Sequence, residues 1–163
     1  MPVPPSMLAS QPKVNGRWTI LLARASLNVL RRHLRHHGLR AESRADLAAC
    51  FERAHPAALE WLDDCVDALA PVVRAAISVL DVPVCVIDSD IDGGFVNALI
   101  ARLRSGLHDI APEWRVSPQI RRGSFGPEAG ALGAASLPMF VHFAPRADVL
   151  RGRPVAGARQ PWD

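Results

Sequence analysis

The stretch AISVLDVPVCVIDSDIDGGFVNALIARLRSGL, residues 76–107, decides the fold class of this chain. It begins at the end of an amphipathic helix, whose apolar residues from Ala58 to Val79 recur in steps of three and four. The β-branched run Val82–Ile87 is bounded by turn-forming residues and predicts a short buried strand. A second helix is expected over residues 94–109. The residues expected to face the core from it are Phe95, Leu99, Leu103 and Leu107.

A further strand and helix are expected downstream, over residues 114–120 and 127–137. Strands that alternate with helices predict an α/β fold with a mainly parallel sheet. Two strands form only a small sheet, and an isolated two-stranded sheet is marginally stable. We therefore expect a helix-rich α/β chain that represents part of a larger fold.

The N-terminal half is predicted to be helical after a proline-rich start. Residues 1–15 hold four prolines and are expected to form a disordered leader. Helices are expected over 20–37, ending at Gly38, and over 44–54, where Ser43 and Asp46 resemble a capping box. Two prolines mark the long helix: Pro56 suits its first turn, and Pro71 is expected to kink or split it. After Phe143 the periodicity is lost, which predicts a flexible tail over 144–163.

The composition excludes several classes of protein. The chain has 163 residues, 49% of them hydrophobic and 21% charged, as in an ordinary globular protein. It has no apolar run of the roughly 20 residues that span a bilayer, and its N-terminus does not resemble a secretory signal. We therefore expect a cytoplasmic protein with no membrane partner. Cys50, Cys65 and Cys85 are widely spaced and form no CxxC pair, which favours reduced, mostly buried thiols over disulfides or a zinc site.

The acidic segment DSDIDGG, residues 88–94, has two interpretations. Asp88, Asp90, Asp92 and Gly93 match the opening of a calcium loop, which needs carboxylates at alternating positions. The twelfth position, where such a loop carries a bidentate glutamate, is Leu99. The pattern therefore favours an acidic turn whose aspartates cap the helix at 94–109.

His33, His36 and His37 include pairs spaced by three and four residues, which share a helix face and suit metal chelation. No Asp, Glu or Cys near them in the sequence completes a site, and the surrounding arginines repel cations. A solvated basic helix face is favoured, and no metal site is expected. The net charge is only +3 and no helix-turn-helix is evident, so autonomous nucleic-acid binding is not expected.

The helix at 127–137 is rich in small residues, with Pro127 in its first turn and Pro138 at its expected end. Glycine inside a helix costs roughly 1 kcal/mol relative to alanine, so something is expected to approach this backbone closely. The small residues that share one face are Gly126, Gly130, Gly133 and Ala134. Glu128 would repel a phosphate at the N-terminus, which favours close packing against protein over ligand binding.

Three segments resemble, in this order, the C-terminal end of the ROK family of sugar kinases and sugar-responsive repressors. They are AISVLDVPVCVID (76–88), NALIARLRSGL (97–107) and PQIRRGSFGPEAGALGAASLPMF (118–140). Upstream, ASLNVLRRHLRHHG (25–38) resembles the segment that follows the family's zinc motif, so the resemblance covers about residues 16–152. It implies most of the C-terminal lobe of an actin-like ATPase (ribonuclease H-like) fold over residues 16–143. It also implies nucleotide-binding positions at Gly126, Gly130 and Gly133.

The sequence departs from the family pattern at the residues that carry chemistry. It contains no DxGxT phosphate loop, no catalytic Asn-Asp pair, no ExGH sugar motif and no winged helix-turn-helix. Where the family's zinc motif ends, the chain reads GRWT, with Arg17 and Thr19 at the positions of the last cysteine and the sugar-binding glutamate. The glycine pair at the strand end is replaced by Asp88 and Ser89. No catalysis and no cofactor are therefore expected.

The resemblance leads to one functional expectation and two alternatives. The expected function is a truncated sugar-sensing effector lobe of a bacterial ROK-family transcriptional regulator, because the LPMFVHFAP ending (137–145) is more similar to a repressor than to a kinase. Its implied partners are a sugar ligand and a second copy of the chain in a homodimer. One alternative is the C-terminal part of a sugar kinase that needs a separate N-terminal lobe. The other is a non-functional gene remnant.

Overall fold

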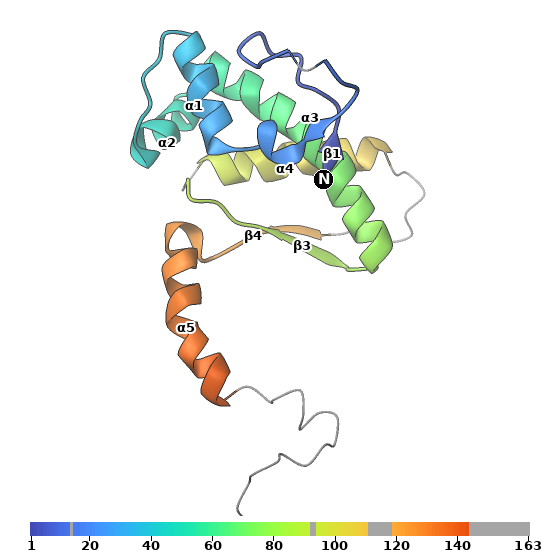
Figure 1. Cartoon of the computed structure of the whole chain (residues 1–163), viewed down its shortest axis with the longest axis vertical. Coiled ribbons are helices and arrows are strands. Elements are labelled where there is room, and N and C mark those ends of the chain that lie inside the picture. Colours follow the sequence, from blue (N-terminus) through green and yellow to red (C-terminus); the bar gives the residue numbers. More distant parts are fainter. Residues whose placement is uncertain (14, 92–93, 111–118, 144–163) are drawn as a thin grey trace, which may run out of the picture. The chain divides into compact units, whose positions relative to one another are not determined.

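The computed structural model describes residues 1–13, 15–91, 94–110 and 119–143 (Figure 1). The chain divides into two compact units, Met1–Pro127 and Glu128–Asp163, called here the first and second unit. The boundary lies within η2 (Gly126–Glu128), between Pro127 and Glu128. The predicted tail, residues 144–163, lies outside the described residues.

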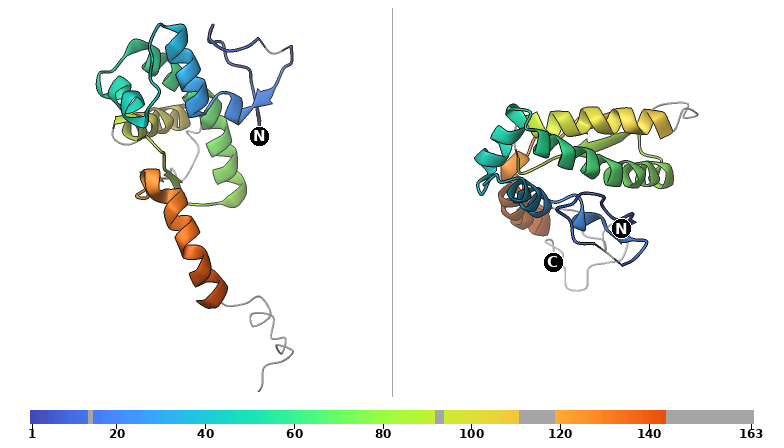
Figure 2. Two further views of the ribbon diagram at one scale, coloured as in Figure 1. Left: turned by 60° about the vertical axis from the view of Figure 1, so that its left-hand side comes forward. Right: turned by 90° about the horizontal axis from the view of Figure 1, so that it is seen from above.

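Four helices form the core of the first unit: α1 (Leu27–His36), α2 (Arg44–Glu52), α3 (Pro56–Leu80) and α4 (Gly94–Ile110). α3 and α4 run alongside each other, α1 packs on α3, and α2 lies against both α3 and α4 (Figure 2). The predicted inward residues of α4 are all buried: Phe95, Leu99, Leu103 and Leu107. They pack with Leu30, Leu34, Leu62 and Trp61 in one continuous cluster.

The small sheet pairs β3 (Val84–Ile87) with β4 (Gln119–Arg122) in parallel, in register from Val84 opposite Gln119 to Ile87 opposite Arg122. This confirms the parallel arrangement expected from alternating helices and strands. Ile120 is 1% exposed and packs into the core, where α4 lies against β4. β3 was predicted to be a buried strand, but Val86 is 63% exposed, since no described residue of the first unit covers this face of the sheet at Val86.

The N-terminal residues are ordered, contrary to the predicted disordered leader. β1 (Pro2–Val3) pairs antiparallel with β2 (Thr19–Ile20), and Val3 is buried. The buried guanidinium of Arg24 holds this segment in place. It donates to the carbonyl of Pro4 at 3.0 Å and forms ion pairs with Asp64 at 2.7 Å and Asp67 at 3.0 Å on α3. Side-chain contacts therefore hold the start of the chain against α3.

Several predicted boundaries shift. The helix expected over 20–37 is a 3-10 turn, η1 (Leu21–Ala23), followed by α1, and α1 ends before Gly38, whose φ is +77°.

The predicted capping box is present: Ser43 accepts from the N–H of Asp46 at 3.0 Å, and Asp46 accepts from the N–H of Ser43 at 2.9 Å. Pro71 does not split α3, which is continuous over 25 residues. The strand expected over 114–120 is β4, and residues 111–118 lie outside the described part.

The second unit contains α5 (Ala129–Phe143), which η2 (Gly126–Glu128) precedes. Pro138 was expected to end this helix but lies inside it. A helix continues past a proline when other contacts or solvent satisfy the carbonyl one turn earlier. No residue of α5 is buried.

Candidate functional site

The candidate site lies at the carboxyl end of β3, where Asp88 and Ser89 follow the strand. Because β3 and β4 are parallel, their carboxyl ends meet at the same edge of the sheet, and the turn Gly123–Gly126 after β4 comes next to Asp88. Ligands in α/β folds bind outside the carboxyl ends of parallel strands. Both the strand end and the turn belong to the first unit.

Asp88 accepts main-chain hydrogen bonds from the turn after β4. The N–H of Phe125 donates to Oδ2 at 3.0 Å, and the N–H of Gly126 donates to Oδ1 at 3.0 Å and to Oδ2 at 3.1 Å. The N–H of Ser89 donates to Oδ1 at 2.9 Å. Successive main-chain N–H groups of this kind form an anion-binding concavity. Here the carboxylate of Asp88 fills it.

Gly123 allows Asp88 to take this position. A Cβ atom on Gly123 would lie 2.6 Å from Cγ and 2.7 Å from Cβ of Asp88. The N–H of Gly123 also donates to the carbonyl of Ile87 at 2.7 Å and extends the ladder between the two strands. Any larger residue at 123 would displace the carboxylate.

Burial opposes ionisation of Asp88, but hydrogen bonds from the N–H groups of Gly126, Ser89 and Phe125 and the charge of Arg122 outweigh it. The pKa of the Asp88 carboxyl group therefore lies below its ordinary value. The group is negatively charged at neutral pH. A phosphate placed at this turn would find its donors occupied and would face a like charge at hydrogen-bond distance.

A cavity of about 700 Å³ opens beside Asp88. Ser26, Asp88, Ser89 and Asp90 provide polar groups to its lining, and most of the remaining lining is apolar. The core residues that line it include Trp61, Cys65, Leu69, Phe95 and Leu99. The indole N–H of Trp61 is buried and has no hydrogen-bond partner among the described residues. A mostly apolar cavity with a few polar groups is the usual form of a small-molecule site, and its volume lies within the common range of about 300–1,000 Å³.

No family model matches the sequence, and no curated protein matches it. Among solved structures, the chain is similar to a ROK hexokinase from Thermus thermophilus, with a TM-score of 0.53 and 24% sequence identity. The similarity covers 81% of this chain and 45% of the hexokinase chain. The chain has the fold of part of a ROK protein. The resemblance drawn from the three sequence segments is thus confirmed at the level of the fold, and this chain spans less than half of the hexokinase.

The ROK-type fold is here α/β and helix-rich, as expected from the sequence. None of the helices in the described residues is both long enough and apolar enough to cross a membrane. All three cysteines are free thiols. Cys65 is buried as expected, whereas Cys50 and Cys85 are only half-buried.

The calcium-loop interpretation does not agree with the geometry. The oxygens of Asp88 accept hydrogen bonds from main-chain N–H groups, and Asp90 pairs with Arg44 at 3.3 Å. Leu99, at the twelfth position, is 5% exposed in the core. Asp92 and Gly93 lie outside the described residues. Asp88 itself caps the turn after β4. Capping of the helix at 94–109 by the aspartates of this segment stays a prediction, because the residues directly before α4 lie outside the described part of the chain.

The small-residue face divides between the two units. Gly126 belongs to the first unit, with a φ of +56°, whereas Gly130, Gly133 and Ala134 lie on α5 in the second. Within the described part of the second unit, no atom lies within 4 Å of a Cβ built on Gly130 or Gly133. The close packing that the sequence favoured is therefore not seen among the described residues of that unit. Nucleotide binding by these glycines stays a prediction.

The histidine segment lies at the end of α1, and the structure brings to it a residue that the sequence did not indicate. No Asp, Glu or Cys lies near these histidines in the sequence, but the fold places Glu60 of α3 beside His33 and His37. Glu60 is 23 positions from His37 in the sequence, so only the packing of α1 on α3 reveals it. His33 is 1% exposed, and burial, partly opposed by the charge of Glu60, lowers its pKa below the ordinary value.

Proposed function

We propose that this chain is the sugar-effector lobe of a ROK-type transcriptional regulator, which binds a hexose in the cavity beside Asp88 and transfers no phosphate. In this proposal the fold is part of an actin-like lobe, and the chain associates as a homodimer. One observation carries the proposal: a carboxylate stands at the end of β3 and occupies the main-chain donors of the following turn.

The first reason is electrostatic. Phosphoryl transfer requires donors and cations arranged around the phosphates. Here the N–H groups of Phe125 and Gly126 already bind Asp88, and the carboxylate adds negative charge. The sequence resemblance aligns Asp88 and Ser89 with a glycine pair in the family. The replacement therefore disfavours a nucleotide at this position and leaves a neutral ligand acceptable.

The second reason is the chemistry of the cavity lining. A hexose offers several hydroxyl groups, which donate to carboxylates, and Asp88 and Asp90 both line the cavity. The indole N–H of Trp61 lacks a partner among the described residues, and a buried Trp N–H normally has one. Trp61 lines the cavity, so its indole group would report on a sugar bound there. The apolar remainder of the lining would exclude water from the pyranose ring.

Calorimetric titration tests this proposal. We expect glucose, N-acetylglucosamine or N-acetylmannosamine to bind, and ATP with Mg²⁺ to give no heat of binding. Asp90→Asn should weaken hexose binding about tenfold, because a charged acceptor at a hydroxyl is worth roughly 1.5–3 kcal/mol. Asp81→Asn, at the left-handed C-cap of α3, is the matched control and should leave binding unchanged. Binding of ATP, or binding of none of the three sugars, would contradict the proposal.

A sugar kinase is the second candidate, and the shared fold with a hexokinase favours it. In that case Gly126, Gly130 and Gly133 would contact the nucleotide, and a second polypeptide with the DxGxT and ExGH motifs would complete the centre. Phosphorylation of a hexose by ATP only in the presence of such a polypeptide would support this candidate. A non-functional remnant, in contrast, should lack the cooperative thermal unfolding expected of an effector lobe.

A further inference from the structure

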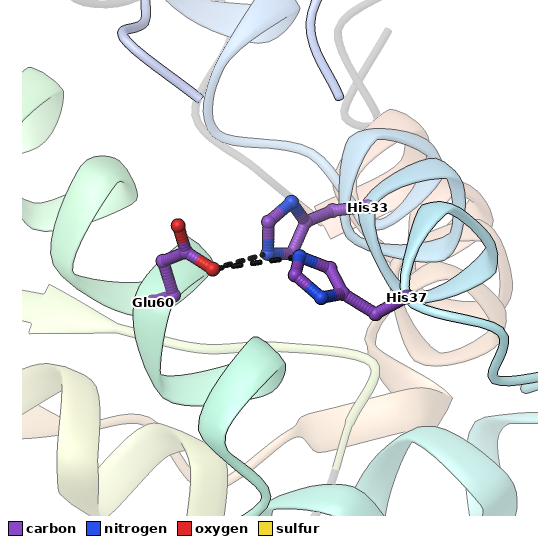
Figure 3. Close-up of side chains that lie close together, drawn as sticks. All are labelled: His33, His37 and Glu60. Carbon is purple, nitrogen blue, oxygen red and sulfur yellow. Dashed lines mark ion pairs between the residues drawn. The ribbon is translucent and has the colours of Figure 1, made fainter. Parts of the chain in front are cut away.

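A cluster of three side chains joins α1 to α3 away from Asp88. His33 in the last turn of α1 and His37 at its C-cap are separated by four residues, so their rings lie on one face. Glu60 extends from the N-terminal part of α3 toward both rings (Figure 3). All three residues belong to the first unit.

The distances from Glu60 to the two imidazole nitrogens match the separations between ligand atoms around a tetrahedral metal ion. Nε2 of His33 lies 3.4 Å from Oε2 of Glu60, and Nε2 of His37 lies 3.5 Å from the same oxygen. Zinc binds imidazole nitrogen and carboxylate oxygen at about 2.0–2.2 Å, so two ligands at the tetrahedral angle are about 3.4 Å apart. One ligand atom from each residue lies within 4.8 Å of the others. The side chain of His37 is 41% exposed, and its ring lies edge-on to that of His33 with 4.7 Å between the centroids.

His33 has the hydrogen bonding of a metal ligand. Its Nδ1 lies 2.7 Å from the hydroxyl of Ser10, while its buried Nε2 has no hydrogen-bond partner among the described residues. A buried polar atom without a partner is costly and rare. Metal-bound histidines typically use the second ring nitrogen for a hydrogen bond that fixes the ring and its tautomer. When Nδ1–H donates to Ser10, the lone pair on Nε2 faces the carboxylate of Glu60, and the two groups repel each other. A cation bound between them would attract both.

We propose that His33, His37 and Glu60 bind one divalent transition-metal ion, Zn²⁺ by preference, and that this ion joins the C-terminal end of α1 to α3. Two imidazoles and one carboxylate form a recognised zinc donor set, which leaves a fourth position for water. The family's zinc motif ends, in the sequence resemblance, at residues 16–19, so this site uses different residues. Zinc binding at this site does not require a bound sugar. The site is therefore independent of the proposed function.

The surrounding charges are compatible with a cation. The two rings are neutral as ligands, and Glu60 contributes one negative charge. Arg35 is paired with Glu42 at 3.3 Å, and Arg32 donates to the side chain of Gln11. Both guanidinium groups are thus directed to partners other than the three ligands.

Titration of the metal-free, tag-free full chain with ZnCl₂ tests the site, with Co²⁺ as a spectroscopic probe. We expect one equivalent to bind, a rise in the midpoint of thermal unfolding, and the intense visible absorption of four-coordinate Co²⁺. Because His33 is buried and its substitution would disturb the core, the ligand variants are His37→Gln and Glu60→Gln, both at exposed positions. Each should weaken Zn²⁺ binding at least tenfold.

His36→Gln is the matched control, because His36 is exposed and its ring contacts that of His37 without facing Glu60. This variant should bind Zn²⁺ within twofold of the unmodified chain. The proposal is overturned if the unmodified chain binds no stoichiometric Zn²⁺. Binding that survives both ligand variants, or that His36→Gln weakens as much as they do, overturns it as well.

Discussion

A Cβ atom on Gly123 would lie 2.6 Å from the side chain of Asp88, so Asp88 can keep its position only while residue 123 is a glycine. Gly123→Ala should therefore displace the carboxylate and lower the free energy of unfolding by about 1–3 kcal/mol, as overpacked positions do. Urea denaturation measures the change. Gly106→Ala in α4 is the control, since its Cβ would meet only the Cβ of Ala70 at 3.8 Å. That variant should be neutral or stabilising by up to about 1 kcal/mol, and a larger loss there than at Gly123 would refute the argument.

Asp88 should contribute to the pH dependence of stability. Its pKa in the folded chain lies below the ordinary aspartate value, because the main-chain donors outweigh desolvation. The stabilisation is therefore fully present above about pH 3.9, the ordinary value, and is lost as the pH falls through the folded-state pKa. Asp88→Asn should unfold at a lower temperature than the unmodified chain at pH 7. The difference should shrink below pH 4, and a difference that grows on acidification would contradict this assignment.

The ion pair of Arg24 with Asp64 should stabilise the fold far more than an exposed pair does. Both side chains are buried, at 3% and 8% exposure, so Asp64→Ala leaves the guanidinium with main-chain carbonyls and the exposed carboxylate of Asp67. Removal of one partner from a buried pair costs about 3–5 kcal/mol. Asp63→Ala removes the neighbouring carboxylate, which is 65% exposed and paired with Arg102. Asp63→Ala should lower the free energy of unfolding by less than about 1 kcal/mol. Equal losses of unfolding free energy in the two variants would exclude a structural role for the buried pair.

Cys65 should be unreactive in the folded chain. Burial, with a smaller contribution from the charge of Asp64, raises the pKa of its thiol to about 12. Because the thiolate is the nucleophile, iodoacetamide at pH 8 should label Cys65 only after unfolding. Mass spectrometry of the labelled peptides measures this, with Cys50 and Cys85, which are half-buried, as internal references. Labelling of Cys65 in the native chain at the rate of Cys85 would show that the core opens locally.

The sequence predicted the elements whose determinants are local. The inward positions of α4 from Phe95 to Leu107 follow from periodicity, and the capping box of Ser43 and Asp46 follows from spacing alone. The parallel pairing of β3 and β4 also followed from the alternation of helices and strands.

The errors concern contacts between distant segments. The order of the N-terminal residues depends on Arg24 and Asp64, which are 40 positions apart, and prolines alone suggest flexibility. Glu60 is absent from any local histidine pattern, because α3 supplies it through tertiary packing. Asp88 was expected to help cap α4. Its oxygens instead accept hydrogen bonds from the N–H groups of Phe125 and Gly126, because the parallel strands place their carboxyl ends side by side.

The most direct test of the central claim is an amide NMR titration of the main-chain N–H groups of Phe125 and Gly126. These two groups report whether the turn after β4 is occupied by Asp88 or by a phosphate. The account predicts that ATP with Mg²⁺ leaves both resonances unchanged, while a hexose shifts the indole N–H resonance of Trp61 to saturation. Saturable shifts of Phe125 and Gly126 with ATP, and none at Trp61 with any hexose, would contradict it.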